Sequence, residues 1–240
     1  MKKLLFCLLA IFGMVQIDTQ AQTTASNLHS DWTILLQKHV TATGRVNYGG
    51  FKTDKDKLDA YIGKLRENSP QTGWSREQKI AYWINLYNAF TIQKVTEKYP
   101  NISSIMDLDG GKIWTTAKIN LAGKDYTLDG IEKEILIKEL KEPRVHFAVN
   151  CAAVSCPPLM NKAWEESSLN RSLETRAKDF LNNKSYNIIT FNELRLSKIF
   201  EWYAADFVNV TAFVRKYSKA TFNTSAAIKY LDYDWKLNKQ

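Results

Sequence analysis

The sequence predicts an α+β protein, a single helix-rich domain with β-hairpins packed around a buried central helix. Apolar residues recur with a helical period over most of the chain, whereas the stretches with strand character are short and come in pairs joined by turns. Residues 76–98 add a third observation, because a helix that is apolar on nearly every face has to be covered on all sides. We divide the mature chain into an N-terminal helical segment, residues 22–73, that packs on the core, and a main domain, residues 74–240.

The N-terminus has the features of an export signal. Two lysines follow the first methionine, and Leu4–Val15 is an apolar run of about 12 residues, which is typical of a signal-peptide core. Thr19-Gln20-Ala21 supplies the small residues of a cleavage site. The run is shorter than the ~20 residues of a membrane span. We therefore expect residues 1–21 to be a signal peptide and the mature chain to be exported, periplasmic or extracellular, without a transmembrane segment.

The N-terminal segment is predicted to contain two amphipathic helices. Apolar residues recur at helical spacing over residues 28–40 and again over residues 54–66. His29 and His39 accompany the first of these helices, and we interpret both as surface positions.

The central helix has the clearest boundaries in the chain. Ser75, followed three residues later by Gln78, is a capping-box signature, and a Tyr-Pro pair follows the last helical residue. Asn85 and Asn88 interrupt the apolar middle of the helix at i,i+3 spacing. Because a buried amide without a partner costs ~1–3 kcal/mol, we expect each to bond backbone or another side chain.

The remaining elements are predicted from turn signals and periodicity. In chain order they are a hairpin over residues 118–128, a helix capped by Asp129, an alternating strand over residues 144–149, an amphipathic helix over residues 168–182, a hairpin over residues 186–196 turning at Asn192-Glu193, a segment capped by Ser197, and two closing helical stretches.

The charge distribution argues against one class of function. The net charge is +8 at pH 7, but the excess is spread along the chain instead of forming a basic tract. Nucleic-acid binders usually concentrate their positive charge, so we expect no nucleic-acid partner. A mildly basic exported protein is suited to weak contact with anionic envelope components.

Residues 144–159 contain most of the reactive side chains. His146 is the only histidine beyond residue 39, and Cys151 and Cys156 are the only cysteines outside the predicted signal peptide. These groups fall within eleven residues, so we take His146, Asn150, Cys151 and Cys156 as the candidate catalytic residues.

Four interpretations of this segment remain open. A thiolate activated by a neighbouring imidazole would make Cys156 a nucleophile, with Asn150, Asn85 or Asn88 orienting the ring or donating to an oxyanion. A disulfide between the two cysteines, or two buried thiols, would make the segment structural, which is the most economical interpretation in an oxidising compartment. The same pair could cycle between dithiol and disulfide, although its Cys-x4-Cys spacing differs from the usual Cys-x-x-Cys. The three side chains also offer soft zinc or copper ligands, without an obvious fourth.

Other chemical signatures are weak. The sequence has no phosphate-binding Gly-rich loop with Lys, no His-Glu-x-x-His and no Gly-x-Ser-x-Gly, so we predict no cofactor and no metal. The aromatic pairs Trp83/Tyr87 and Trp202/Tyr203 invite comparison with carbohydrate-stacking platforms, but their helical spacing favours core packing. Glu132 and Asp206 are potential acid–base groups that we attribute to solvated surface or helix capping.

Five ordered strings resemble a known family. They are Trp83-Ile-Asn-Leu-Tyr-Asn-Ala, Leu128-Asp-Gly-Ile-Glu, Pro143-Arg-Val-His-Phe-Ala, Ser155-Cys-Pro-Pro-Leu, and Trp202-Tyr203 with Asp206-Phe207. Over residues 74–210 the chain is similar to the domain-of-unknown-function family 547 (DUF547). The resemblance implies no agreed activity, and bacterial relatives are often exported single-domain proteins. Many members have a histidine directly after the Ile-Glu pair, where this chain has Lys133.

The sequence therefore predicts an exported DUF547-type protein of unassigned biochemical activity. One alternative is a cysteine-dependent hydrolase or transferase that acts on an amide or ester through Cys156 and His146. Another is a non-catalytic envelope interaction protein, in which residues 144–159 only shape the core.

Overall fold

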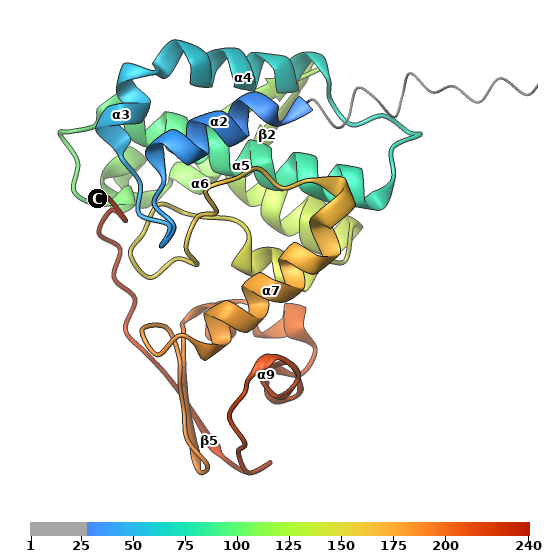
Figure 1. The fold of residues 1–240 in the computed structure, drawn as a ribbon, viewed down its shortest axis with the longest axis vertical. Coiled ribbons are helices and arrows are strands. Elements are labelled where there is room, and N and C mark those ends of the chain that lie inside the picture. Colours follow the sequence, from blue (N-terminus) through green and yellow to red (C-terminus); the bar gives the residue numbers. More distant parts are fainter. Residues whose placement is uncertain (1–27) are drawn as a thin grey trace, which may run out of the picture.

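The computed structural model describes residues 28–240, and the predicted signal peptide lies outside this range. The α+β prediction is confirmed: helices dominate, and the strands form an antiparallel pair, β1–β2, and a three-stranded sheet in the order β3-β4-β5 (Figure 1). Within residues 28–240, no helix is both long enough and apolar enough to cross a bilayer.

The N-terminal helices form one end of the molecule, next to the central helix (Figure 1). The helices expected over residues 28–40 and 54–66 are present as α2 (Ser30–His39) and α4 (Lys55–Glu67), with a short α3 (Tyr48–Thr53) between them. Their apolar faces belong to the same hydrophobic cluster as the central helix.

The prediction that His29 and His39 lie at the surface is wrong. Both side chains are buried, because polar partners far along the chain satisfy them. His29 Nδ1 lies 2.8 Å from the Tyr61 hydroxyl, and His39 Nε2 lies 2.8 Å from Asp54 Oδ2.

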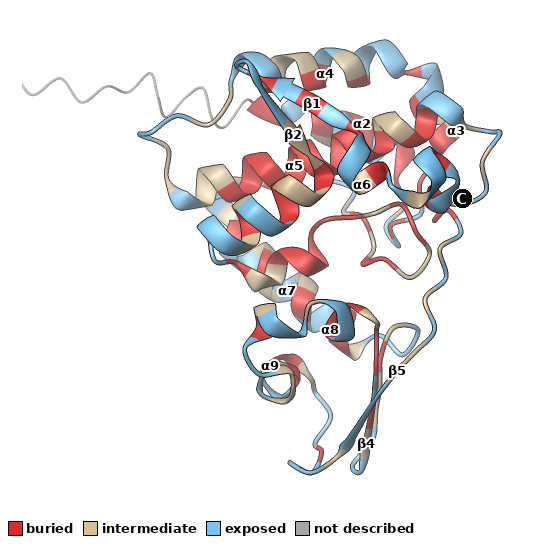
Figure 2. Ribbon diagram, turned by 180° about the vertical axis from the view of Figure 1, so that it is seen from behind, coloured by how far each residue is buried: buried red, intermediate tan, exposed pale blue. Residues whose placement is uncertain are grey.

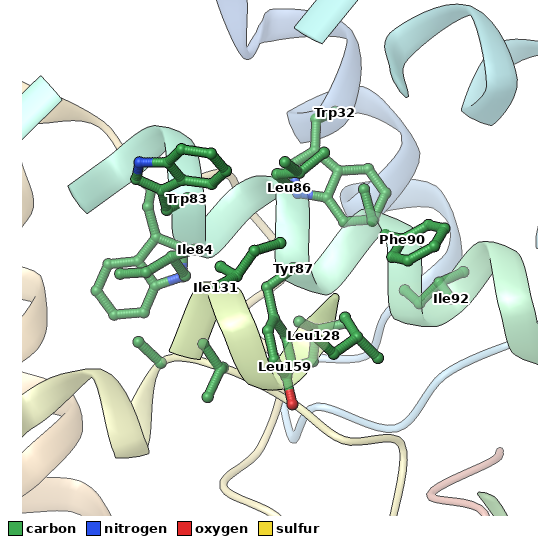
Figure 3. Close-up of a cluster of buried hydrophobic side chains, with 14 of the residues drawn as sticks. Trp32, Trp83, Ile84, Leu86, Tyr87, Phe90, Ile92, Leu128, Ile131 and Leu159 are labelled. Atoms are coloured by element: carbon green, nitrogen blue, oxygen red, sulfur yellow. The ribbon is translucent and has the colours of Figure 1, made fainter. Parts of the chain in front are cut away.

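The central helix is α5 (Arg76–Lys98), and its boundaries match the prediction. The Ser75 side chain accepts from the Gln78 N–H while the Gln78 side chain accepts from the Ser75 N–H, so the capping box is complete. The middle of α5 is buried on all sides (Figures 2 and 3). Its two buried asparagines also have partners, as expected. Asn85 bonds both the N–H and the C=O of Trp164, at 3.0 and 2.8 Å.

The first hairpin pairs β1 (Lys118–Leu121) with β2 (Lys124–Thr127), as predicted; it follows η1 (Ile105–Gly111) and α6 (Ile113–Thr116). The next helix, η2 (Gly130–Glu139), is wound as a π-helix. Asp129 does not cap it through its side chain, contrary to the expectation. Its carboxylate instead pairs with Lys133, at 2.8 Å.

The strand predicted over residues 144–149 is wrong. The chain forms a short 3-10 helix there, η3 (Pro143–Phe147), and no strand within residues 28–240 pairs with it. Pro143 occupies the first turn, where its fixed φ suits a helix, and the Glu142 side chain accepts from the Arg144 N–H. Val145, His146 and Phe147 are all buried, so the alternation of inward and outward side chains on a strand does not apply.

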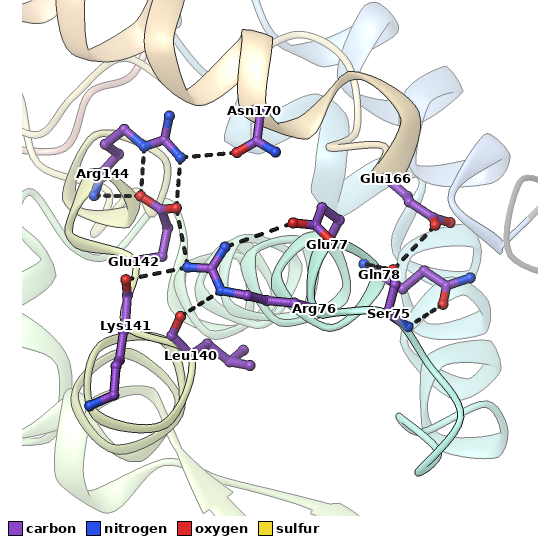
Figure 4. A network of polar contacts seen from close by, with 10 residues as sticks. All are labelled: Ser75, Arg76, Glu77, Gln78, Leu140, Lys141, Glu142, Arg144, Glu166 and Asn170. Carbon is purple, nitrogen blue, oxygen red and sulfur yellow. Dashed lines mark hydrogen bonds and ion pairs between the residues drawn. The ribbon is translucent and has the colours of Figure 1, made fainter.

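An ion-pair network fixes η2 and η3 against the start of α5 (Figure 4). Arg76 donates to the backbone carbonyls of Leu140 and Lys141, at 2.9 and 3.3 Å. Arg144 donates two hydrogen bonds to the buried Glu142 carboxylate, at 2.6 and 2.7 Å. This bidentate geometry is rigid. The two elements that position Glu132 and His146 are therefore held relative to the central helix.

A second hydrophobic cluster lies at the other end of the molecule (Figure 1). After η4 (Glu166–Ser168), the amphipathic helix predicted over residues 168–182 is α7 (Leu169–Asn182), and Ala177, Phe180 and Leu181 from it join this cluster. The second hairpin is also confirmed. The elements of this end are β3 (Ile188–Ile189), β4 (Glu193–Leu196), α8 (Ile199–Trp202), η5 (Ala204–Phe207) and α9 (Val210–Tyr217).

The end of the chain differs from the prediction of two closing helices. Only α9 is helical; the other stretch is β5 (Ala227–Tyr230), which pairs parallel to β4. From there the chain returns along the molecule in an extended form to the N-terminal end (Figure 2). It makes bridges to Ser104, Ala153 and Val46 on the way. These pairings with distant backbone compensate for the lost helical hydrogen bonds.

Candidate functional site: a cavity beside His146

A cavity of about 340 Å³ opens between the central helix and the returning C-terminal tail. This volume lies within the range of small-molecule sites. Residues of α5, α6, η2, η3 and α8, and of the loops between elements, contribute to its wall. The lining residues are Tyr87, Gly111, Lys112, Trp114, Thr115, Asp129, Glu132, Lys133, His146, Val149, Cys151, Cys156, Pro157, Ile199, Trp202, Tyr203, Tyr233 and Trp235.

His146 lies between two carboxylates at one wall of this cavity. Its Nδ1 donates to Glu132 Oε1 at 3.1 Å, and its Nε2 donates to Asp206 Oδ2 at 2.9 Å. The imidazole also stacks on the Tyr203 ring, with centroids 4.1 Å apart. Glu132 comes from η2, His146 from η3 and Asp206 from η5, so three separate elements converge here.

The two carboxylates favour the charged form of the imidazole. Burial lowers the pKa of His146, but the hydrogen bonds to Asp206 and Glu132 and their negative charges outweigh burial, so its pKa lies above the ordinary value. Both ring nitrogens can donate only as imidazolium. Burial and the charge of Glu132 raise the pKa of the Tyr203 phenol, which therefore keeps its proton.

Aromatic side chains form another part of the lining. Trp202 stacks on Trp235 with centroids 5.5 Å apart, and Trp114 meets the edge of Trp235 at 5.8 Å. Tyr233 packs against both Trp202 and Trp235. Trp202 is 47% exposed, unusually high for a tryptophan, so part of its ring is open to a ligand. We call Trp114, Trp202, Tyr233 and Trp235 the aromatic wall.

The two cysteines are joined by a disulfide that lines the same cavity. The structure therefore brings three of the four predicted site residues, His146, Cys151 and Cys156, to one cavity wall. Both ring nitrogens of His146 are bonded to carboxylates, so in this form the imidazole has no nitrogen free for a sulfur.

Asn150, the fourth predicted residue, supports the loop and does not line the cavity. Its side chain donates to the Pro157 carbonyl at 2.8 Å and accepts from the Ala152 N–H at 2.9 Å. Its own N–H donates to the Asn88 side chain, at 2.8 Å. Asn88 and Asn150 thus fix the start of the segment that bears the cysteines.

The sequence did not identify Glu132 and Asp206 as the partners of His146. Glu132 is only 4% exposed, which contradicts its interpretation as a solvated surface group. Asp206 bonds the imidazole instead of capping a helix. Both lie inside the strings that resemble the DUF547 family, and that was the available signal. Trp83 is buried as expected, but Trp202 is not a core residue.

The charged rim of the cavity includes the departure from the family pattern. Lys133 lines the cavity together with Lys112, and it pairs with Asp129. Across residues 28–240, no group of three or more His, Cys, Asp or Glu side chains has an arrangement that could hold a metal ion.

The fold and site define an α+β domain in which a buried imidazole lies between a buried and a partly exposed carboxylate at a cavity. Residues 71–181 match the family described as "Protein of unknown function, DUF547". These residues belong to this family, and the matched region includes Glu132, His146 and both cysteines. No curated protein and no solved structure matches the chain.

Proposed function

We propose that this is an exported protein that binds a sugar unit of an envelope polymer in the cavity, with Glu132 as the hydrogen-bond acceptor for its hydroxyl groups. The observation that carries the proposal is the placement of the buried Glu132 carboxylate and the aromatic wall around one cavity. Sugar rings have apolar C–H faces that pack on aromatic rings, and hydroxyl edges that donate to carboxylates.

The surroundings of Glu132 suit this role. A carboxylate in a nearly dry wall gains more from a hydrogen bond than one in water. His146 holds one of its oxygens, so the carboxylate is oriented before a ligand arrives.

Export is supported by the signal-like N-terminus and by the disulfide, because disulfides persist mainly in oxidising compartments. The aromatic wall then faces compounds of the periplasm or the exterior.

Tryptophan fluorescence provides the test, because three tryptophans belong to the aromatic wall. The purified mature chain is titrated with neutral and uronic-acid oligosaccharides, and with amino-sugar oligosaccharides. We expect a saturable change in emission. The affinity derived from it should fall at least tenfold in Glu132→Gln and in Trp202→Ala. Glu134→Gln, on the exposed side of the same helix, and Phe191→Ala, an exposed aromatic outside the cavity, are the matched controls. Equal binding by Glu132→Gln and the native chain would contradict the proposal.

The cysteine-dependent hydrolase or transferase remains an alternative, favoured by the presence of His146 and Cys156 at the same cavity. It requires reduction of the disulfide and release of one ring nitrogen by a carboxylate. Hydrolysis of p-nitrophenyl acetate or an aminoacyl p-nitroanilide that appears only after reduction, and is lost in Cys156→Ser, would support it. If neither sugars nor these substrates are recognised, the non-catalytic interaction protein becomes the better interpretation.

A further inference from the structure

The two sulfurs of the disulfide have different surroundings. Cys151 is partly exposed, whereas Cys156 is only 5% exposed. Both line the cavity, so a small thiol that enters it meets the more accessible sulfur first. Thiol–disulfide exchange depends strongly on which sulfur is attacked and which one leaves.

Hydrogen-bond donors converge on Cys156. The N–H of Cys151 donates to Cys156 Sγ at 3.0 Å, and the Tyr233 hydroxyl donates to the same sulfur at 3.2 Å. The Tyr233 hydroxyl also lies 3.3 Å from Cys151 Sγ, so that proton is shared, but the N–H serves Cys156 alone. Burial and the charge of Glu132 raise the pKa of Tyr233, which therefore keeps the proton it donates.

We propose that Cys151 and Cys156 form a redox-active pair that accepts two electrons from a dithiol, with Cys151 as the attacked sulfur and Cys156 as the leaving thiolate. A thiolate of the dithiol attacks Cys151 Sγ. The Cys151–Cys156 bond breaks, and its electron pair leaves on Cys156 Sγ, where the two donors stabilise the charge. The second thiol of the dithiol then displaces Cys151, which yields a protein dithiol and the oxidised disulfide of the reductant.

Hydrogen bonds hold the loop between the cysteines in addition to the S–S bond. Asn150 bonds the carbonyl of Pro157 and the N–H of Ala152, and the N–H of Val154 donates to the Lys236 carbonyl at 2.8 Å. These bonds would hold the two thiols close together after reduction, so the disulfide can form again. The pair can cycle while the chain stays folded.

This inference does not rest on sugar binding. Its tests measure the reactivity of the cysteines and the effect of Tyr233, whereas the sugar test measures the effects of Glu132 and Trp202 on affinity. The first experiment uses the native chain. It is incubated with glutathione under non-denaturing conditions, quenched with acid, and mapped by peptide mass spectrometry. We expect the trapped mixed disulfide on Cys151. A mixed disulfide mainly on Cys156, or no adduct until denaturant is added, would overturn the proposal.

The second experiment measures the rate of reduction by dithiothreitol for variants. Tyr233→Phe keeps the ring but removes one donor to the leaving sulfur, so we expect reduction several-fold slower than in the native chain. Tyr230→Phe, on β5 and outside the cavity, is the matched control and should reduce at the native rate. A native rate in folded Tyr233→Phe contradicts the role of the hydroxyl. The mapping experiment needs no variant, so it decides the attacked sulfur even if Tyr233→Phe fails to fold.

Discussion

His29 at the start of α2 and His146 at the cavity are buried to nearly the same extent, yet their surroundings shift the pKa in opposite directions. Burial, with a smaller contribution from the charge of Lys64, lowers the pKa of His29 to about 4. Two carboxylates outweigh burial at His146 and raise its pKa. His29 is therefore neutral in the folded protein at pH 7, whereas the surroundings of His146 favour imidazolium. Burial alone does not decide the charge of a histidine; the neighbouring charges do.

The partners explain why only one of these regions resembles a site. His29 bonds a neutral hydroxyl inside a packed helical layer, and nothing around it needs to titrate. His146 keeps two carboxylates together beside an open cavity. Charged groups held in place at a cavity are a common property of functional sites.

The largest expected effect that separates the two regions comes from His146→Ala. The substitution leaves the Glu132 and Asp206 carboxylates without their shared cation, and loss of one partner of a buried ion pair typically costs about 3–5 kcal/mol. Urea unfolding at pH 6 should show this loss of unfolding free energy.

The pH dependence of this loss has a definite sign. The folded pKa of His146 is raised, so its ionic contribution is complete below the unfolded value of 6.5 and disappears as the pH rises through the folded pKa. The difference between His146→Ala and the native chain should therefore shrink at pH 9. A difference that stays constant with pH would mean that folding does not shift the pKa of His146. Glu134→Ala, on the exposed side of η2, should change the stability by less than about 0.5 kcal/mol.

His29 should respond to pH in the opposite sense. Its folded pKa is depressed from 6.5 to about 4, so the unfolded chain binds the proton first and stability falls as the pH drops through this interval. At ~1.4 kcal/mol per pKa unit, the loss reaches about 3 kcal/mol at pH 4. His29→Gln lacks this proton, so between pH 7 and pH 4 it should lose about 3 kcal/mol less than the native chain.

Histidine ring resonances in NMR spectra give an independent reading of the same comparison. The resonance missing from His29→Gln should titrate near pH 4, and the one missing from His146→Ala should titrate above pH 6.5. If both histidines titrate on the same side of 6.5, the contrast between the two regions is wrong.

A matched pair of Tyr→Phe substitutions compares the two regions through the smallest expected changes in stability. Tyr61→Phe removes the hydroxyl that bonds His29 Nδ1 and leaves a buried nitrogen unsatisfied, which should cost about 1–2 kcal/mol. Tyr203→Phe keeps the ring that stacks on His146 and removes a hydroxyl near Glu132, which retains its bond to the imidazole. We expect a cost of about 1 kcal/mol or less there. Thermal melts of the two variants, measured side by side, test this order.

Local signals in the sequence were sufficient for several elements. The Ser75/Gln78 capping box fixed the start of α5, and apolar periodicity located α7 and both hairpins, because hydrogen bonds and turns within a few residues determine such boundaries. The prediction failed where the expected element needed a partner strand that the fold does not provide. Residues 144–149 alternate like a strand, but no strand in the described part of the chain pairs with them, and a 3-10 turn satisfies their backbone instead.

The sequence alone determined that this chain is a helix-rich α+β protein with a DUF547-family region, and that His146, Cys151 and Cys156 lie close together, since they fall within eleven residues of the chain. Only the tertiary structure decided what surrounds them. Glu132 and Asp206 lie 14 and 60 residues along the chain from His146, which they contact. Tyr233 lies 77 residues along the chain from its partner, Cys156. Such contacts follow from the packing of whole elements, which no local pattern of residues records. The same packing buries His29 and His39 and raises the pKa of the imidazole at the cavity.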